Sequence, residues 1–249
     1  MDSNVLESLM EYIAPQKEDW MVEIGPGRGA LTHYLIQKTN HLCAVEIDKD
    51  LILFLKKNYP HLKLIEGDVL NVDFEKEFNQ KPHRFVGNLP YNISSPFLLL
   101  LKKYKPLFLN GYFVLQKEVV ERLAALPHSK SYGRLSVMMQ YDFNCEKCFE
   151  IPPECFYPAP KVTSALIKIT PKNEKNNRLT VENDILFEKI VFSAFQQRRK
   201  MLKNTLKKFV NEEIAKKCEI DLNQRAENLH VADYVRLVNF IRENNETFI

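Results

Sequence analysis

A short stretch around one asparagine carries the residue types best suited to chemistry. Residues 85–96 read Phe-Val-Gly-Asn-Leu-Pro-Tyr-Asn-Ile-Ser-Ser-Pro. The apolar run stops at Gly87, so a turn is expected over residues 88–91, at the carboxyl end of a strand, where ligands bind in open α/β sheets. The next helix is expected to begin near Pro96, capped by one of the two serines before it.

This turn suits methylation of the N6 amine of adenine, whose lone pair is delocalised into the ring. The Asn88 side-chain oxygen and a backbone carbonyl of Leu89 or Pro90 can each accept one N6 hydrogen. Those bonds improve as the nitrogen becomes tetrahedral, so they stabilise the transition state more than the ground state. Tyr91 can stack on the base. The alternative interpretation is an Asx-type turn with a packed tyrosine.

A proline-rich segment offers a second aromatic wall. Residues 152–160 read Pro-Pro-Glu-Cys-Phe-Tyr-Pro-Ala-Pro, and prolines stiffen such a loop. We predict that Phe156 forms the wall of a base pocket opposite Tyr91. The alternative is a ring packed under the loop.

Three other strand ends indicate a nucleotide cradle. A buried strand over residues 20–24 runs into Gly-Pro-Gly-Arg-Gly, followed by a predicted helix to about Gln37. Glu46 ends the next strand, roughly 20 residues past the first glycine, where an acid typically holds ribose hydroxyls. Asp68 follows a third strand and can accept a hydrogen bond from a cofactor's adenine. Each feature has an alternative interpretation. The glycine turn could be only a tight connection between strand and helix, Glu46 could be a solvated carboxylate, and Asp68 could cap a turn.

The composition favours a soluble globular enzyme. The chain has 249 residues, 45% hydrophobic and 27% charged, with a net charge of +3. No apolar run reaches the ~18 residues that a membrane helix needs, and the N-terminus lacks the pattern of a signal peptide. Five cysteines without a regular framework suit the reducing cytoplasm. The pair Cys145 and Cys148 lacks partners at zinc-site spacing, so no metal site is predicted.

The order of elements predicts an α/β fold. Strands and helices alternate up to about Pro127, which indicates a doubly wound, Rossmann-like parallel sheet. Residues 132–137 are expected to lead into one strand and residues 161–170 to form another, paired antiparallel at the sheet edge. After a polar linker, everything from Val181 is predicted to be helical. We expect a catalytic domain over residues 1–172 and a small all-α domain over residues 178–249.

The helical part contains a basic run without an acid. The cations of residues 196–208 are Arg198, Arg199, Lys200, Lys203, Lys207 and Lys208. They predict contact with the phosphate backbone of a folded RNA. The alternative is a solvated helix face.

Together these motifs resemble the small-subunit rRNA adenine N6,N6-dimethyltransferases, over essentially the whole chain. The resemblance rests on residues 22–32 (Val-Glu-Ile-Gly-Pro-Gly-Arg-Gly-Ala-Leu-Thr), 45–48 (Val-Glu-Ile-Asp), 67–68 (Gly-Asp), 87–96, 115–119 (Leu-Gln-Lys-Glu-Val), 132–136 (Tyr-Gly-Arg-Leu-Ser), 156–164 (Phe-x-Pro-x-Pro-x-Val-x-Ser) and 198–200 (Arg-Arg-Lys). The family normally also has a basic segment with a Gln-x-Phe-Leu pattern, which helps to close the cofactor site; Met1 stands just beyond its place.

The resemblance implies a class I S-adenosylmethionine-dependent methyltransferase. Asn88, Leu89, Pro90, Tyr91 and Phe156 are implied to hold the target adenine, and Arg198, Arg199, Lys200 and Lys203 to contact substrate RNA. The implied contacts to S-adenosylmethionine are Gly25, Gly27, Glu46, Ile47, Asp68, Val69 and Asn88. Such enzymes dimethylate two adjacent adenosines near the 3′ end of small-subunit rRNA, on an assembling subunit. We expect a cytoplasmic monomer.

Three other functions share part of this pattern. A large-subunit rRNA methyltransferase that confers macrolide resistance has the same cofactor motifs, but Leu89 and the Tyr-Gly-Arg-Leu-Ser run favour the small-subunit branch. A non-catalytic ribosome-assembly factor could keep the fold, although intact Glu46, Asp68 and Asn88 argue against it. An adenine-specific DNA methyltransferase usually places Asp or Asn before Pro-Pro-Tyr or Pro-Pro-Trp.

Overall fold

A computed structural model describes residues 1–78, 81–172 and 180–244. Contacts divide the chain into a sheet unit, Met1–Val120 with Phe143–Pro171, and a helical unit, Glu121–Asp142 with Lys172–Ile249. Residues 121–142 therefore cluster with the later helices, whereas the predicted boundary placed them in the catalytic domain with the sheet. Most of the predicted linker lies outside the described residues.

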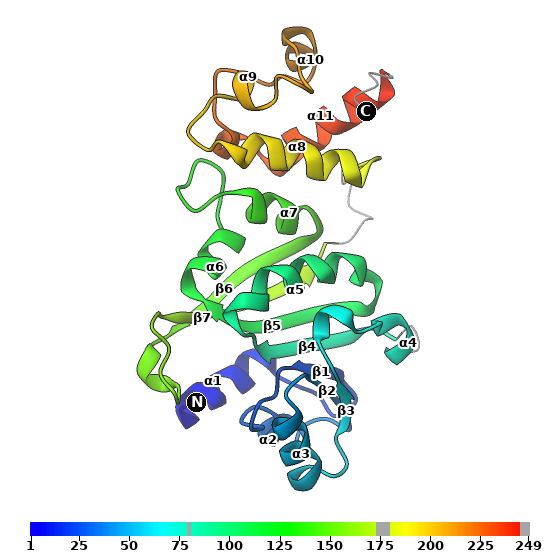
Figure 1. Ribbon diagram of the computed structural model, residues 1–249, viewed down its shortest axis with the longest axis vertical. Helices are drawn as coiled ribbons and strands as arrows, with labels where there is room; N and C mark the ends of the chain where they lie inside the picture. The colour runs from blue at the N-terminus through cyan, green and yellow to red at the C-terminus, as the bar shows by residue number, and fades with distance from the viewer. Residues whose placement is uncertain (79–80, 173–179, 245–249) are drawn as a thin grey trace. The chain divides into compact units, whose positions relative to one another are not determined.

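The sheet unit contains a seven-stranded mixed sheet (Figure 1) in the order β3-β2-β1-β4-β5-β7-β6. The strands are β1 (Trp20–Ile24), β2 (His41–Glu46), β3 (Lys63–Glu66), β4 (His83–Asn88), β5 (Phe108–Gln116), β6 (Phe143–Ile151) and β7 (Ser164–Pro171). The first five are parallel, and β7 runs antiparallel to both β5 and β6. The predicted Rossmann-like sheet with an antiparallel edge hairpin is confirmed.

Helices precede, connect and follow the parallel strands. They are α1 (Ser3–Ile13), α2 (Thr32–Leu35), α3 (Lys49–Asn58), α4 (Phe74–Phe78), α5 (Tyr91–Lys103) and α6 (Lys117–Leu123), with 3₁₀ turns η1 (Val69–Asn71), η2 (Lys105–Leu107) and η3 (Pro153–Cys155). Asp2 caps α1 and Asp48 caps α3, each with a side-chain oxygen accepting backbone N–H groups, as such residues do at helix starts.

Two helices differ from the sequence prediction. Helix α5 begins at Tyr91, and Pro96 lies inside it; Ser94 is no cap, because its hydroxyl donates to the Pro90 carbonyl at 3.0 Å. Residues 134–142 form the helix α7 (Arg134–Asp142) rather than leading directly into a strand. The strand β6 starts only at Phe143, after six buried residues of that helix.

The helical unit contains α7 and the helices α8 (Asp184–Gln196), α9 (Leu202–Thr205), α10 (Glu212–Lys217) and α11 (Val231–Glu243), with the turn η4 (Ala226–Asn228). Buried apolar faces of α8 and α11 supply much of its core, for example Phe187, Ile190, Leu237 and Ile241. The described part of this unit contains no strand longer than an isolated bridge between Met201 and Arg225.

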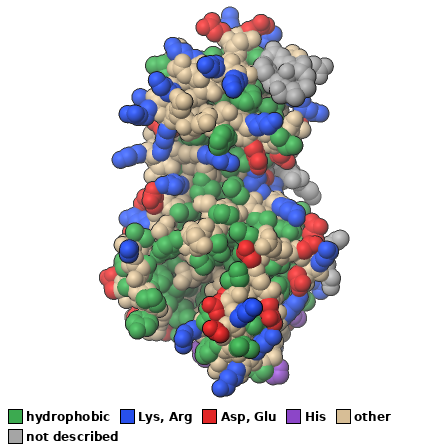
Figure 2. Space-filling view, in the orientation of Figure 1, with side chains coloured by type: hydrophobic (Ala, Val, Ile, Leu, Met, Phe, Trp, Pro, Cys, Tyr) green, Lys and Arg blue, Asp and Glu red, His purple; other side chains and the backbone are tan. Residues whose placement is uncertain are grey.

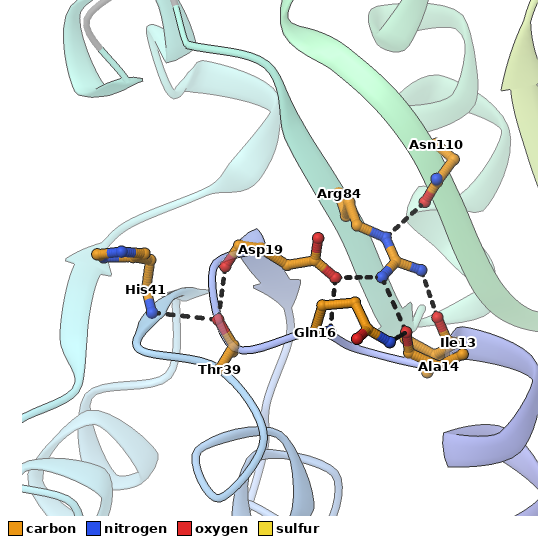
Figure 3. Close-up of polar contacts among 8 residues, drawn as sticks. All are labelled: Ile13, Ala14, Gln16, Asp19, Thr39, His41, Arg84 and Asn110. Carbon is orange, nitrogen blue, oxygen red and sulfur yellow. Dashed lines mark hydrogen bonds and ion pairs between the residues drawn. The ribbon is translucent and has the colours of Figure 1, made fainter.

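A buried arginine joins the first helix to the middle of the sheet (Figure 3). Arg84 on β4 is 8% exposed. Its guanidinium donates to the Ile13 and Ala14 carbonyls, pairs with Asp19 and reaches Asn110 Oδ1 at 3.1 Å. These bonds satisfy carbonyls at the end of α1 that have no partner within the helix.

We expect Arg84→Met to lower the free energy of unfolding by about 3 kcal/mol, because it leaves a largely buried carboxylate and helix-end carbonyls without their donor. Lys56→Met is the control: it removes a surface pair with Glu66, whose side chains are 56% and 51% exposed, and should cost less than about 1 kcal/mol. Urea denaturation measures both. Equal losses would contradict the anchoring role.

Candidate active site

The strand register brings the predicted site residues of the sheet unit to one edge. Ile24 pairs with Val45 on one side and with Gly87 on the other, and Glu46 pairs with Glu66. The strands β1 to β4 therefore end level with one another. Gly25, Glu46, Asp68 and Asn88 lie at or directly after those ends, as the sequence predicted.

The glycine turn, residues 25–29, lies against the Asn88–Tyr91 segment. Its three glycines have positive φ, at 64°, 59° and 78°, a conformation that glycine adopts without steric cost. A Cβ on Gly25 would lie 3.9 Å from Pro90 Cδ, and one on Gly27 would meet nothing within 4 Å. The turn leads into only four residues of helix α2, shorter than the predicted helix to Gln37.

The Glu46 carboxylate ties the glycine turn to the end of β2. Its Oε2 accepts the Gly27 N–H at 3.1 Å, and its Oε1 accepts the N–H groups of Ile47 and Asp48 at 2.9 and 3.1 Å. A carboxylate has about four acceptor positions. Three are used by the backbone, so one remains for a hydroxyl of a bound ligand.

A second carboxylate, which the sequence analysis did not name as a site residue, connects the two elements that flank the glycine turn. Glu23 is 2% exposed, and its Oε2 accepts the Thr32 hydroxyl at 2.6 Å. Thus the strand before the glycine turn is bound to the helix after it. Burial raises the pKa of Glu23 to about 7, against the lowering effect of the Thr32 hydrogen bonds, and nearby Glu46 raises it further.

Asp68 and Val69 follow the end of β3, and Ile47 follows the end of the neighbouring strand β2. Asp68 Oδ1 accepts the Leu70 N–H at 2.9 Å, so it caps η1, which was the alternative interpretation. Ile47 is 64% exposed and Val69 is 5% exposed. An exposed Ile47 suits contact with a flat ring, whereas Val69 contributes to the core.

In the acceptor turn, residues 88–91, the two candidate carbonyls differ. The Pro90 carbonyl already accepts bonds from Ser94 Oγ at 3.0 Å and the Ile93 N–H at 3.1 Å. Among the described residues, no donor reaches the Leu89 carbonyl. Leu89 as a whole residue is 1% exposed and its N–H donates to Val114, so the turn is anchored while Asn88 is exposed.

Tyr91 is anchored at its tip. Its hydroxyl lies 3.2 Å from Ser164 Oγ, while 38% of the residue is exposed. Ser164 pairs with Ile151, so the β6–β7 loop, residues 152–163, starts and ends beside this tyrosine. Half-buried Phe156 of that loop packs against the apolar core under α1, which fits the packing alternative; its position as a pocket wall stays a prediction.

The cations of the helical unit divide into two kinds. Arg198 donates to the Lys130 and Tyr132 carbonyls and pairs with Glu227 at 3.1 Å, and Lys203 Nζ donates to Asn223 at 3.0 Å. Arg199 and Lys200 are exposed, with no side-chain partner among the described residues. Figure 2 shows Lys and Arg side chains scattered over the surface of this unit.

Two kinds of feature are not found in the described ranges. No group of three or more His, Cys, Asp or Glu residues is placed to hold a metal ion. Nor is any helix there long and apolar enough to cross a membrane.

The strand order, the antiparallel hairpin at the edge and the glycine turn after β1 define a class I S-adenosylmethionine-dependent methyltransferase. The positive-φ turn, the free acceptor position on Glu46 and the exposed Ile47 fit that cofactor. The family described as "Ribosomal RNA adenine dimethylase" matches residues 1–243. The chain belongs to this family.

Its relatives include proteins called "Ribosomal RNA small subunit methyltransferase A". The one from Nitrosospira multiformis is 44% identical over 242 residues, covering 96% of this chain and 92% of the relative. The one from Francisella tularensis is 45% identical over 250 residues, covering 96% and 93%.

Solved structures share the fold over nearly the whole chain. A dimethyladenosine transferase from Plasmodium falciparum has a TM-score of 0.82 at 24% identity, with 97% of this chain and 96% of that chain covered. The 23S rRNA methyltransferase ErmE has a TM-score of 0.69 at 21% identity, with 97% and 98% covered.

The buried Glu23 predicts a pH-dependent stability. Because its pKa is raised from 4.5 to about 7 in the folded protein, the folded state keeps a proton that the unfolded state loses, and stability falls as pH rises from about 4.5 to above 7. The fall amounts to about 3 kcal/mol. We expect Glu23→Gln, which retains an acceptor for Thr32, to abolish this fall.

Denaturation series between pH 4.5 and 8.5 provide the measurement. Glu7→Gln, at an exposed acid on α1, is the control and should follow the wild-type profile. Parallel profiles for Glu23→Gln and wild type would show that Glu23 is charged throughout.

Proposed function

We propose that this protein dimethylates the N6 amines of two adjacent adenosines near the 3′ end of small-subunit rRNA, on an assembling subunit. One observation carries the proposal most: the acceptor turn lies against the glycine turn, with 3.9 Å between Pro90 Cδ and a Cβ position on Gly25. Acceptors for an amine thus stand next to the cradle for the methyl donor. Family membership and the relatives' names support the choice of RNA.

The acceptor turn binds the amine through two oxygens. S-adenosylmethionine, when bound, supplies an electrophilic methyl group. The Asn88 amide oxygen takes one N6 hydrogen, and the Leu89 carbonyl takes the other, since the Pro90 carbonyl is already occupied by Ser94 and Ile93. Both bonds strengthen as the nitrogen becomes tetrahedral.

Tyr91 supplies the flat surface against which the adenine stacks. Its hydroxyl is bonded to Ser164, so the ring is oriented before the base arrives and loses little freedom on binding. The proton leaves the nitrogen after methyl transfer, when the product amine is acidic. No strong general base is required, and positioning supplies most of the rate enhancement.

The exposed cations of the helical unit bind the phosphate backbone. Arg199 and Lys200 are the better candidates, because Arg198 and Lys203 already have partners within the unit. All five cysteines are free, which supports action in a reducing compartment, the cytoplasm. We infer a monomeric enzyme that acts there on assembling subunits.

Labelled S-adenosylmethionine tests the proposal against its rivals. The protein is incubated with unmethylated small subunits and, in parallel, with large subunits. Label recovered as dimethyladenosine in small-subunit rRNA supports the proposal, and label in large-subunit rRNA supports the macrolide-resistance activity. Tight small-subunit binding without label indicates an assembly factor instead.

Asn88→Ala should lower the methylation rate on the order of 10²–10³-fold, the usual effect of removing one preorganised transition-state hydrogen bond. The rate is measured at saturating S-adenosylmethionine, because Asn88 is also predicted to contact the cofactor. Asn144→Ala is the control: this exposed asparagine lies on β6 at the opposite end of the sheet. Near-normal turnover of Asn88→Ala refutes the role.

Arg199→Gln and Lys200→Gln should each weaken small-subunit binding. Each should also reduce the salt dependence of log K by roughly 0.7–0.9 for every phosphate that is no longer neutralised. Titrations at several salt concentrations measure the slope. Lys216→Gln, at another exposed cation of the same unit, should leave it unchanged. If all three variants behave alike, the effect is one of net charge only.

A further inference from the structure

The β6–β7 loop exposes an aromatic ring that the target base does not account for. Tyr157 is 96% exposed. It makes no hydrogen bond or ring contact with any described residue. Single exposed apolar residues are common on protein surfaces. Here, however, Pro158, Ala159 and Val162 of the same loop are exposed as well, so the ring is one of several exposed apolar side chains on this loop.

The loop is held in place despite its exposure. The Asp2 N–H donates to the Cys155 carbonyl at 2.7 Å, and the Phe156 N–H donates to the Pro153 carbonyl at 3.1 Å. At its other end, the Lys117 N–H donates to the Thr163 carbonyl at 3.0 Å. A ring on such a loop can bind a partner without the entropy cost of ordering the loop.

The backbone directs the two neighbouring rings apart. Phe156 is extended, with φ −114° and ψ 153°, and successive side chains of an extended chain point to opposite sides. Phe156 packs against the apolar core, so the Tyr157 ring projects outward. The loop that carries it begins and ends beside Tyr91, since Ser164 bonds Tyr91 and pairs with Ile151.

We propose that Tyr157 stacks on the nucleobase next to the adenosine held by Tyr91, and that Lys161 binds the phosphate of that neighbouring nucleotide. This adjacent-base subsite rests on the proposed function, and it holds the second of the two neighbouring nucleotides while the first is bound at Tyr91. Lys161 is exposed, with no side-chain partner in the described part of the chain. Stacking of a base on an aromatic side chain is sequence-tolerant and contributes about 1–3 kcal/mol.

The test is the affinity for unmethylated small subunits, measured without cofactor. Tyr157→Ala is expected to weaken binding about 10-fold, and Tyr157→Phe to stay within about two-fold of wild type because the ring is retained. Tyr157→Leu should match the alanine variant, since apolarity alone does not stack. Leu109→Ala, at a residue 52% exposed on β5, is the control. The exposure of Tyr157 means that its variants should keep the wild-type denaturation midpoint.

Small subunits with an altered rRNA sequence test which base stacks on Tyr157. In subunits whose rRNA has uridine in place of one of the two adenosines, the loss caused by Tyr157→Ala should shrink to below about three-fold for at least one of the two positions, because pyrimidines stack more weakly. Lys161→Gln should reduce the salt dependence of log K by roughly 0.7.

Several outcomes overturn the subsite: wild-type affinity in Tyr157→Ala, wild-type affinity in Tyr157→Leu, or an equal loss on both uridine substrates. Label transfer by wild-type protein is recorded separately. An absence of label with the expected affinity pattern refutes the methylation proposal but keeps the subsite. Label transfer by the wild-type protein, together with wild-type affinity in the Tyr157 variants, supports the methylation proposal and refutes the subsite.

Discussion

The site depends on one carboxylate that satisfies backbone N–H groups of two different segments. Glu46 accepts from Gly27 across the sheet edge and from Ile47 and Asp48 in its own turn. Hydrogen bonds to a charged acceptor are about twice as strong as neutral ones. The glycine turn is therefore fixed to β2 as well as to β1, and its position relative to Asn88 follows from the sheet register. A cradle built in this way is ordered before any ligand arrives.

The parts of the fold that the sequence predicted are those set by local pattern. The strands before Gly25, after His41 and before Asn88 are apolar runs with a clear end, and parallel pairing then aligns those ends. The errors arose where tertiary packing decides. Pro96 was taken as a helix start because proline favours the first turn, but the helix had already begun at Tyr91. Residues 134–142 have no strong helical periodicity because six of the nine residues of this helix are buried.

Two further residues could have been noticed and were not. Glu23 and Arg84 both stand within apolar strand sequences, and a charged residue in such a place needs a partner. The sequence cannot name those partners, since Thr32 approaches Glu23 through a turn and Asp19 approaches Arg84 from 65 positions away. Long-range contacts of this kind depend on the folded sheet. The roles of Asp68 and Phe156 were ambiguous for the same reason: capping and packing use the same residue types as ligand binding.

The hydrogen-bond acceptors at this site fall into two groups: those that already bind protein donors, and those that have no protein donor among the described residues. The Pro90 carbonyl, Asp68 Oδ1 and most of the Glu46 carboxylate already accept protein N–H or hydroxyl groups. The Leu89 carbonyl and the exposed Asn88 amide do not, although both sit on a backbone fixed by the bond from Leu89 to Val114. An unsatisfied acceptor on a rigid turn costs stability, and a ligand that supplies a donor removes that cost. A planar amine with two hydrogens has one hydrogen for each of these oxygens, which supports the proposal that adenine N6 binds here.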